Sequence, residues 1–208
     1  MKALILCNGE PPLRELFEEN LADADLFIAC DGAAKLALAY SRTPDIIIGD
    51  LDSLGPELAK LPNVIFVADQ NSNDLEKALN FARARGASHA CIMGASGLRF
   101  DHFLCNLYIL PRFVSSMSLR LVDNHGEAWV ARRTEEIKAQ INTPISFFAL
   151  GEKPVTKLCL EGLQYGLHDA TLEPYSPRAA LNYFAQNHAR ITHESGVLLI
   201  YAVLRAQA

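Results

Sequence analysis

The sequence predicts an α/β protein, in which an N-terminal domain with a doubly wound parallel sheet is followed by a C-terminal all-β sandwich domain. Two observations predict this fold class. Up to about residue 123, short apolar runs alternate with segments of helical periodicity, as repeated strand–helix units do. After Asn124-His125-Gly126, short strand-like runs separated by Gly and Pro take over. We therefore expect two domains, residues 1–124 and residues 125–208, with almost no linker between them.

The expected strands of the first domain are mostly unbroken apolar runs, which suits parallel strands covered by helices on both faces. They are Ala3–Cys7, Leu26–Cys30, Asp45–Ile48, Val64–Val67, His89–Met93 and Leu119–Val122. The expected helices between them have apolar residues at a spacing near 3.6. They are Leu13–Leu21, Ala33–Tyr40, Asp74–Arg85 and Asp101–Val114.

The second domain has no amphipathic pattern of three helical turns, and its strands are short and evenly spaced, as in a sandwich or barrel. The expected strands are Glu127–Arg132, Ile137–Ile141, Ile145–Leu150, Val155–Leu160, Ala170–Leu172, Arg190–His193 and Val197–Val203.

Composition narrows the class of partner and the compartment. The formal net charge of −5 argues against a nucleic-acid or anionic-membrane partner, since both need a basic face. The five cysteines are odd in number and include no Cys-x-x-Cys pair, so a reducing, cytoplasmic setting is expected. No run approaches the roughly 18 apolar residues of a membrane-spanning helix.

Aspartates follow several of the expected strands. Asp50 and Asp52 come after Asp45–Ile48, Asp74 comes after Val64–Val67, and Asp31 ends Leu26–Cys30 in the same way. Ligands bind at the carboxyl ends of the strands in open α/β sheets, and carboxylate oxygens suit Mg²⁺. In extended backbone, the spacing of Asp50 and Asp52 puts both side chains on one side. The alternative is that these residues form a turn and a helix cap.

The segment Asn73-Asp74-Leu75-Glu76 also has two interpretations. It matches a capping box, with Asn73 as the N-cap and Glu76 three residues later. It could equally present Asp74 to a metal and Lys77, one turn on, to a phosphate. If Asp74 and Lys77 have only a structural role, they would form a weak ion pair on the surface of the helix.

The segment Gly94–His102 follows an expected strand and opens a helix. Its two glycines permit close backbone approach to a ligand, and Arg99 can grip phosphate oxygens. The pattern is neither a Walker A loop nor a dinucleotide-binding fingerprint. Asp101 and His102 could simply be polar residues at a helix end.

Taken in order, these motifs resemble the thiamine pyrophosphokinase (thiamine diphosphokinase) family. The matching segments are Asp31-Gly32-Ala33-Ala34, Gly49-Asp50-Leu51-Asp52-Ser53, Asn73-Asp74-Leu75-Glu76-Lys77-Ala78-Leu79, Gly94–His102 with Asn106, Gly162–Leu167 and Ser195–Leu199. The resemblance spans nearly the whole chain. It implies transfer of a diphosphoryl group from ATP to the hydroxyl of thiamine, giving thiamine diphosphate and AMP.

The resemblance also implies roles for individual residues. The Mg²⁺ ligands would be Asp50, Asp52 and Asp74, and these three with Lys77 and Arg99 would carry the catalysis. The residues that bind ATP would be Asp31, Lys77, Arg99, Asp101 and His102. The residues near thiamine would be Gln70, Asn73, Leu181 and Asn182. The first domain would bind ATP and Mg²⁺, and the second would bind thiamine and form a homodimer in which one subunit completes the other's thiamine site.

The sequence departs from the family pattern in both halves. Ala33, Ala95 and Leu98 stand where the family has glycines, and Asn73 stands for a common Thr. Leu181-Asn182 replaces a Ser-Asn pair that contacts thiamine, so one hydroxyl is missing. Two alternatives follow: a diphosphotransferase for another heterocyclic alcohol such as a hydroxymethylpterin, or a thiamine- or nucleotide-binding protein without turnover.

Overall fold

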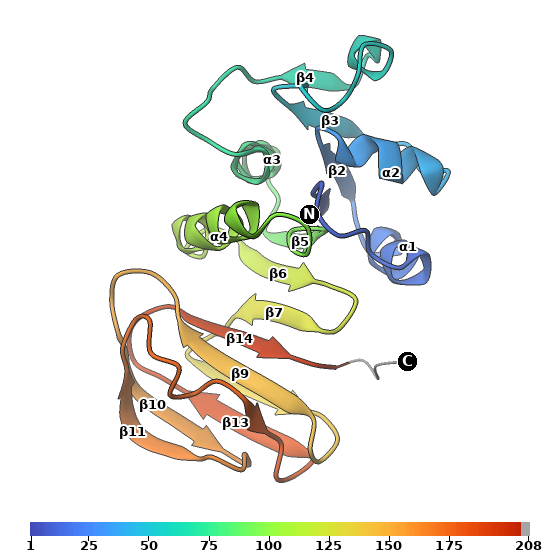
Figure 1. Ribbon diagram of the computed structural model, residues 1–208. Helices are drawn as coiled ribbons and strands as arrows, with labels where there is room; N and C mark the ends of the chain where they lie inside the picture. The colour runs from blue at the N-terminus through green and yellow to red at the C-terminus, as the bar shows by residue number, and fades with distance from the viewer. Residues whose placement is uncertain (205–208) are drawn as a thin grey trace. The chain divides into compact units, whose positions relative to one another are not determined.

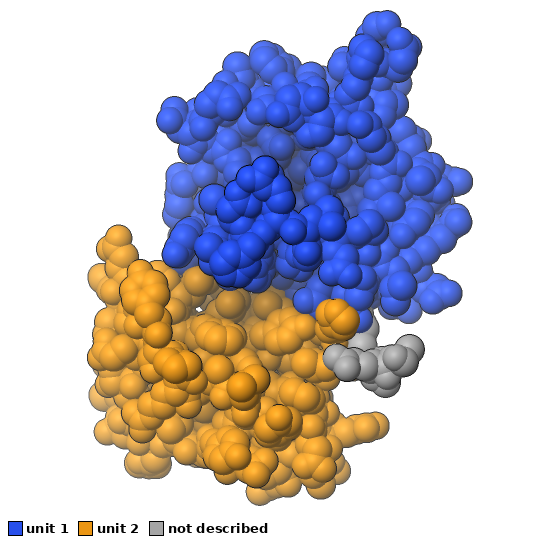
Figure 2. Space-filling view, in the orientation of Figure 1, with its two compact units in different colours: residues 1–124 blue, residues 125–208 orange. Residues whose placement is uncertain are grey.

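The chain forms two compact units, residues 1–124 (unit 1) and residues 125–208 (unit 2), in a computed structural model that describes residues 1–204 (Figures 1 and 2). Among these described residues, no helix is long and apolar enough to cross a membrane.

Unit 1 is built on six parallel strands. Along the sheet their order is β6-β5-β1-β2-β3-β4, so β1 lies between β2 and β5. The strands are β1 (Lys2–Leu6), β2 (Leu26–Cys30), β3 (Ile46–Gly49), β4 (Val64–Phe66), β5 (His89–Met93) and β6 (Ser118–Val122). All five residues of β2 are buried, as expected for a parallel strand covered on both faces.

Helices cover both faces of this sheet (Figure 1). They are α1 (Arg14–Ala22), α2 (Ala33–Ala39), α3 (Asp74–Ala84) and α4 (Phe100–Ile109), with short 3₁₀ turns η1 (Leu58–Lys60) and η2 (Leu110–Arg112). One apolar core joins Phe17 of α1 and Ala34 of α2 to Phe27 of β2. Leu75 and Leu79 of α3 are also buried, and α3 packs on β1, β2 and β3. The unit is therefore doubly wound.

Unit 2 is a sandwich of antiparallel strands. Its strands are β7 (Glu127–Val130), β8 (Thr134–Lys138), β9 (Pro144–Ala149), β10 (Val155–Glu161), β11 (Leu167–Leu172), β12 (Asn182–Tyr183), β13 (His188–Thr192) and β14 (Leu198–Ala202). They pair in the orders β12-β9-β14-β7 and β11-β10-β13-β8. Phe147 and Ile200 from the first set share one core with Leu158 and Ile191 from the second, and all four are fully buried.

This architecture confirms the predicted fold class, and the differences are local. The helix expected over Asp101–Val114 ends at Ile109, because Pro111 has no N–H to continue the helical hydrogen bonds. The strand expected at Ile137–Ile141 lies instead at Thr134–Lys138, where it pairs with β13. The two-residue strand β12 was not predicted, since two residues carry no periodicity.

Candidate active site

The candidate site of unit 1 lies at the carboxyl ends of its parallel strands. The sheet grows from β1 in both directions, with β2 on one side and β5 on the other. Such a reversal leaves a crevice beyond the strand ends, which is where open α/β sheets bind their ligands. The segments that follow β2, β3, β4 and β5 carry most of the residues singled out in the sequence.

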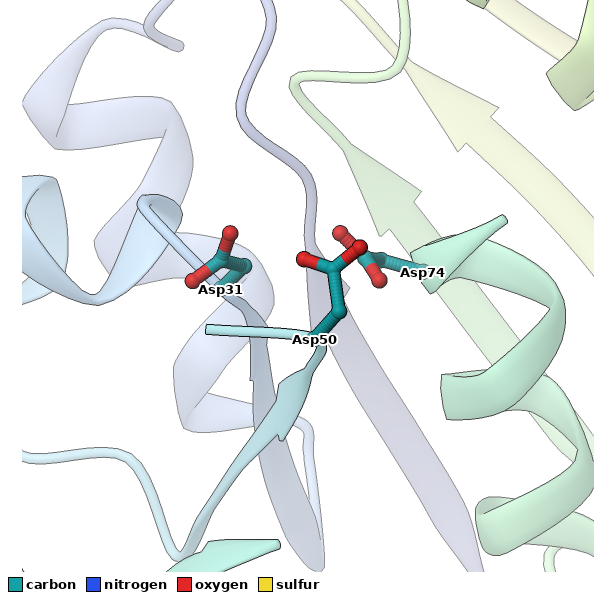
Figure 3. A group of neighbouring side chains, drawn as sticks. All are labelled: Asp31, Asp50 and Asp74. Atoms are coloured by element: carbon teal, nitrogen blue, oxygen red, sulfur yellow. The ribbon is translucent and has the colours of Figure 1, made fainter. Parts of the chain in front are cut away.

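Three carboxylates meet at this edge. Asp31 follows β2, Asp50 follows β3, and Asp74 is the first residue of α3. One oxygen from each lies within 4.8 Å of the other two, and Figure 3 shows the three side chains converging. We name Asp31, Asp50 and Asp74 the acidic group. The sequence expectation that aspartates at the ends of neighbouring strands gather together therefore holds for these three.

A glycine makes the close approach possible. A Cβ on Gly49, the last residue of β3, would lie 2.9 Å from the Asp31 Cβ and 3.2 Å from Asp74 Oδ1. Real Cβ atoms essentially never come within 3.0 Å of another heavy atom. Any larger residue at position 49 would therefore push Asp31 and Asp74 apart.

Asp31 is the most buried member of the acidic group, with 2% of its surface exposed. Its Oδ2 accepts hydrogen bonds from Ser53 N at 3.0 Å and from Ser53 Oγ at 2.7 Å. Its Oδ1 is buried and has no hydrogen-bond partner within residues 1–204. Burial raises the pKa of Asp31 above its ordinary value, and the hydrogen bonds from Ser53 oppose that rise. A buried carboxylate oxygen without a protein partner, such as Asp31 Oδ1, is suited to binding a cation.

A lysine offsets part of this negative charge. Lys77 Nζ lies 3.0 Å from Asp74 Oδ1, and only 4% of the Lys77 side chain is exposed. This is the pairing across one helical turn that the sequence suggested, in a buried setting rather than as a surface pair. Since a buried ammonium needs a negative partner, Lys77 and Asp74 hold each other at the start of α3.

Asp52 is not one of the three residues whose oxygens converge within 4.8 Å, but its side chain interacts with those of Asp31 and Asp50. The expectation of extended backbone between Asp50 and Asp52 was wrong, because Leu51 has a φ of 66° and turns the chain. The Asp52 Oδ1 contacts Ser53 Oγ at 2.8 Å, and this hydrogen bond lowers the pKa of Asp52. Ser53 therefore lies between Asp52 and Asp31, with its hydroxyl close to both carboxylates.

The start of α3 confirms one half of the predicted capping box and corrects the other. Asn73 Oδ1 accepts a hydrogen bond from Glu76 N at 2.9 Å, as an N-cap does. The Glu76 side chain does not reach back to Asn73. It is buried and forms an ion pair with Arg112 Nη1 at 2.7 Å, because η2 brings that guanidinium to it.

The loop from Gly94 to Arg99 presents backbone amides. Its carbonyls at 94, 95 and 96 accept hydrogen bonds from Gly9 N, Asn106 Nδ2 and Glu10 N, respectively, at 2.7 to 2.8 Å. The N–H groups of residues 95–98 donate to no partner within the described chain. Free amides just before a helix are suited to anions. The exposed Arg99 side chain adds positive charge beside them.

The remaining unit 1 residues lie around this edge. Arg99 forms an ion pair with Asp101, and its hydrogen bonds lower the pKa of Asp101 to about 2. His102 is exposed at the start of α4, and its N–H donates to Asp101 Oδ1. Gln70 Nε2 lies 3.3 Å from Asp50 Oδ2, so this side chain touches the acidic group.

Leu181 and Asn182 belong to unit 2. Leu181 is 76% exposed and has a φ of 55°. Asn182 is buried, and its amide bonds to the backbone of Tyr165 in both directions, at 3.0 and 2.8 Å. The structure therefore gives Asn182 an internal partner, while the Leu181 side chain faces outward.

Sequence reasoning gave no individual role to two residues that hold the site together. Ser53 binds Asp31, and Asn106 binds Asn73 and Ala95. Both stand inside motifs that were recognised, but Ser53 lies 22 residues from Asp31, and Asn106 lies 33 residues from Asn73 and 11 from Ala95. Spacing along the sequence carries no signal for contacts of this kind.

A family model for the catalytic domain of thiamin pyrophosphokinase matches residues 17–122 of the chain. The chain belongs to the thiamin pyrophosphokinase family. This membership confirms the family that the motifs of the sequence resemble.

Individual relatives agree with this membership. Thiamin pyrophosphokinase 1 of Caenorhabditis elegans is 28% identical over 184 residues, which cover 81% of this chain and 76% of that protein. Thiamine pyrophosphokinase of Bacillus subtilis is 26% identical over 184 residues, which cover 84% and 86% of the two chains.

Solved structures share the fold. The crystal structure of the Bacillus subtilis thiamine pyrophosphokinase aligns with a TM-score of 0.82 at 21% identity, over 98% of this chain and 100% of that one. The yeast thiamin pyrophosphokinase aligns with a TM-score of 0.79 at 19% identity, over 97% and 86% of the two chains. The match extends through both units of the chain.

Proposed function

We propose that this chain is a thiamine diphosphokinase, which transfers a diphosphoryl group from ATP to the hydroxyl of thiamine. The hydroxyl oxygen attacks the β-phosphorus of ATP and loses its proton. The bond from the β-phosphorus to the oxygen that bridges it to the α-phosphorus breaks. AMP leaves with that oxygen, and thiamine diphosphate is formed.

The observation that carries the proposal is the acidic group beside a buried lysine, in a chain that belongs to the thiamin pyrophosphokinase family. Phosphoryl-type transfer asks for little covalent chemistry from the protein. Positioning of the phosphates and neutralisation of their charge supply most of the catalysis. A site of this kind needs carboxylates for a divalent cation together with cationic and amide groups for phosphate oxygens.

The acidic group fits Mg²⁺. It offers three hard oxygen ligands within 4.8 Å of one another, and the buried Asp31 Oδ1 lacks a protein partner. When bound, Mg²⁺ would offset the negative charge of the phosphates of ATP. Asp31, Asp50 and Asp74 would hold it, and Asp52, whose side chain interacts with Asp31, Asp50 and Ser53, would stand beside them as the further ligand that the family resemblance implies.

The remaining residues of unit 1 would bind the polyphosphate. Lys77 reaches the acidic group from α3 and would place its ammonium on a phosphate oxygen. Arg99 and the free amides of residues 95–98 would take further phosphate oxygens, with Asp101 and His102 at the same helix end. Gln70, which touches Asp50, would stand where the acceptor meets the phosphates.

Unit 2 would supply the acceptor side and the contacts of a homodimer. The exposed Leu181 would face the acceptor, whereas Asn182 would act by holding the backbone of Tyr165. The five cysteines are all free thiols, which supports a reducing, cytoplasmic compartment.

The direct test is AMP release from ATP and Mg²⁺, with and without thiamine, together with the mass of the product. Thiamine-dependent AMP and a product with the mass of thiamine diphosphate are the expected results. Transfer to a hydroxymethylpterin and not to thiamine would show that the proposed acceptor, thiamine, is wrong. ATP binding without AMP release for any acceptor would mean that the protein binds the nucleotide but catalyses no transfer.

A further inference from the structure

Two segments that carry the proposed ATP site are joined by a chain of side-chain amides. Asn106 of α4 is 8% exposed. Its Oδ1 accepts a hydrogen bond from Asn73 Nδ2 at 2.9 Å, and its Nδ2 donates to the carbonyl of Ala95 at 2.8 Å. A buried amide that uses both of its ends is a fixed spacer between its two partners.

The partner at one end of this chain is the cap of α3. The other end of the Asn73 amide accepts from Glu76 N, so the same side chain caps the helix whose first turn carries Asp74 and Lys77. Any shift of Asn73 would therefore move the start of α3, and with it one carboxylate of the acidic group.

The partner at the other end is the phosphate-facing loop. The carbonyls on either side of Ala95 are held by Gly9 N and Glu10 N, from the segment after β1. The carbonyl of Ala95 is held only by Asn106 among the described residues. Because a peptide plane is rigid, fixing that carbonyl also fixes the direction of the following N–H, one of the free amides of residues 95–98.

Only one side chain of this size can make both contacts. An amide carries a donor and an acceptor on one planar group, whereas a carboxylate has no donor and leucine has neither. The amide orientation is also set by the network: reversed, it would bring two NH₂ groups together at Asn73 and two oxygens together at Ala95. Asn73, which donates to Asn106, stands where the family pattern has a Thr.

We propose that Asn106 is a positioning residue for the diphosphate transfer, which keeps the amide loop 94–99 and the start of α3 at one spacing. This rests on the proposed function, because it assigns both segments to the phosphates of ATP. Asn106 itself touches no substrate. Because Asn106 holds this spacing, the free amides, Arg99 and Lys77 can contact the polyphosphate at the same time.

The test compares two buried asparagines. Asn106→Leu keeps the shape of the side chain and removes both hydrogen bonds. Asn20→Leu is the matched control, since Asn20 is also buried, at 9% exposure, on α1, and its amide bonds within α1 and to β5 and β6. For each variant we would measure the Kd of a non-hydrolysable ATP analogue with Mg²⁺, the KM for ATP and for thiamine, and the melting temperature.

Both variants should melt earlier, because each loses hydrogen bonds of a buried amide. Only Asn106→Leu should weaken binding of the analogue, by about tenfold, which corresponds to the loss of one or two oriented hydrogen bonds. The KM for ATP should rise in parallel. If Asn106→Leu changes only the melting temperature, as Asn20→Leu does, the positioning role is overturned. Should Asn106→Leu not fold, Asn106→Ala is measured against the same criteria.

The binding readout separates this proposal from the proposed function. An unmodified protein that binds the analogue but transfers no diphosphate would overturn the function, while the Kd comparison would still decide the role of Asn106. An unmodified protein that does not bind the analogue would overturn both.

Discussion

Replacement of Asp31 by Asn tests whether the acidic group holds the metal. The asparagine oxygen can still accept from Ser53 N and Oγ, while an NH₂ group takes the place of the orphaned Oδ1. At an effective dielectric constant of about 20, two unit charges at the separation of this group repel by about 3 kcal/mol, and Lys77 offsets part of that. Without divalent cations, Asp31→Asn should therefore be more stable than the unmodified protein, by roughly 1 kcal/mol.

Addition of Mg²⁺ should reverse this order. A ligand that binds only the folded state at ten times its Kd stabilises by RT ln 11, about 1.4 kcal/mol. For a unit of this size, that is about 5 °C in melting temperature. The unmodified protein should gain this shift, and Asp31→Asn should lose most of it.

The assay is thermal unfolding followed by circular dichroism, with and without Mg²⁺, and Asp69→Asn is the control. Asp69 is an exposed carboxylate that bonds to Asn71 and Ser72, outside the acidic group. It should leave the Mg²⁺ shift unchanged. A full Mg²⁺ shift in Asp31→Asn would refute the assignment of this group, and a shift lost only in Asp52→Asn would return the metal to the ligand set that the family resemblance implies.

Three further outcomes follow from the structure. Gly49→Ala places a Cβ 2.9 Å from the Asp31 Cβ, so turnover and the Mg²⁺ shift should both fall; unchanged values would mean that the strand end gives way freely. Burial lowers the pKa of His193, so the stability that this residue contributes to unit 2 is present above its unfolded pKa of about 6.5 and is lost as pH falls towards the folded value. The melting temperature of unit 2 should thus fall below pH 6.5, and His193→Leu should make it less dependent on pH. Melting curves between pH 5 and pH 8, roughly the range in which histidine titrates, test this expectation. Leu181→Ser should change the KM for thiamine and leave the KM for ATP alone; the reverse pattern in steady-state kinetics would contradict its assignment to the acceptor side.

The sequence predicts most of unit 1 because local signals and tertiary structure agree there. Unbroken apolar runs such as Leu26–Cys30 became buried strands with unchanged bounds. The capping box, one of the two interpretations of this segment, puts Asn73 at the N-cap, and Asn73 caps α3 in the structure. Polar residues at strand ends were expected to gather, since parallel strands bring their carboxyl ends to one edge. Asp31, Asp50 and Asp74 meet this expectation.

What the sequence could not predict depends on single backbone angles or on distant partners. The partner of Glu76 is Arg112, which only the fold of α4 and η2 brings near it. The strand at Thr134–Lys138 is set by its register with β13 rather than by its own pattern, which favoured residues further along. Asn106 acquires its contacts in the same way, because neither Asn73 nor Ala95 is a neighbour in the chain.

The backbone at Leu51 explains how two aspartates two residues apart come to differ. A leucine in the left-handed region costs about 1 kcal/mol, so the surrounding structure must hold it there. The turn directs Asp50 into the acidic group and Asp52 towards Ser53, whose amide and hydroxyl contact Asp31. Asp52 thus reaches the most buried carboxylate of the group both directly and through Ser53. A substitution at Asp52 can therefore impair the site through its contacts with Asp31, Asp50 and Ser53, whether or not Asp52 is itself a ligand, and loss of turnover alone would not distinguish the two roles.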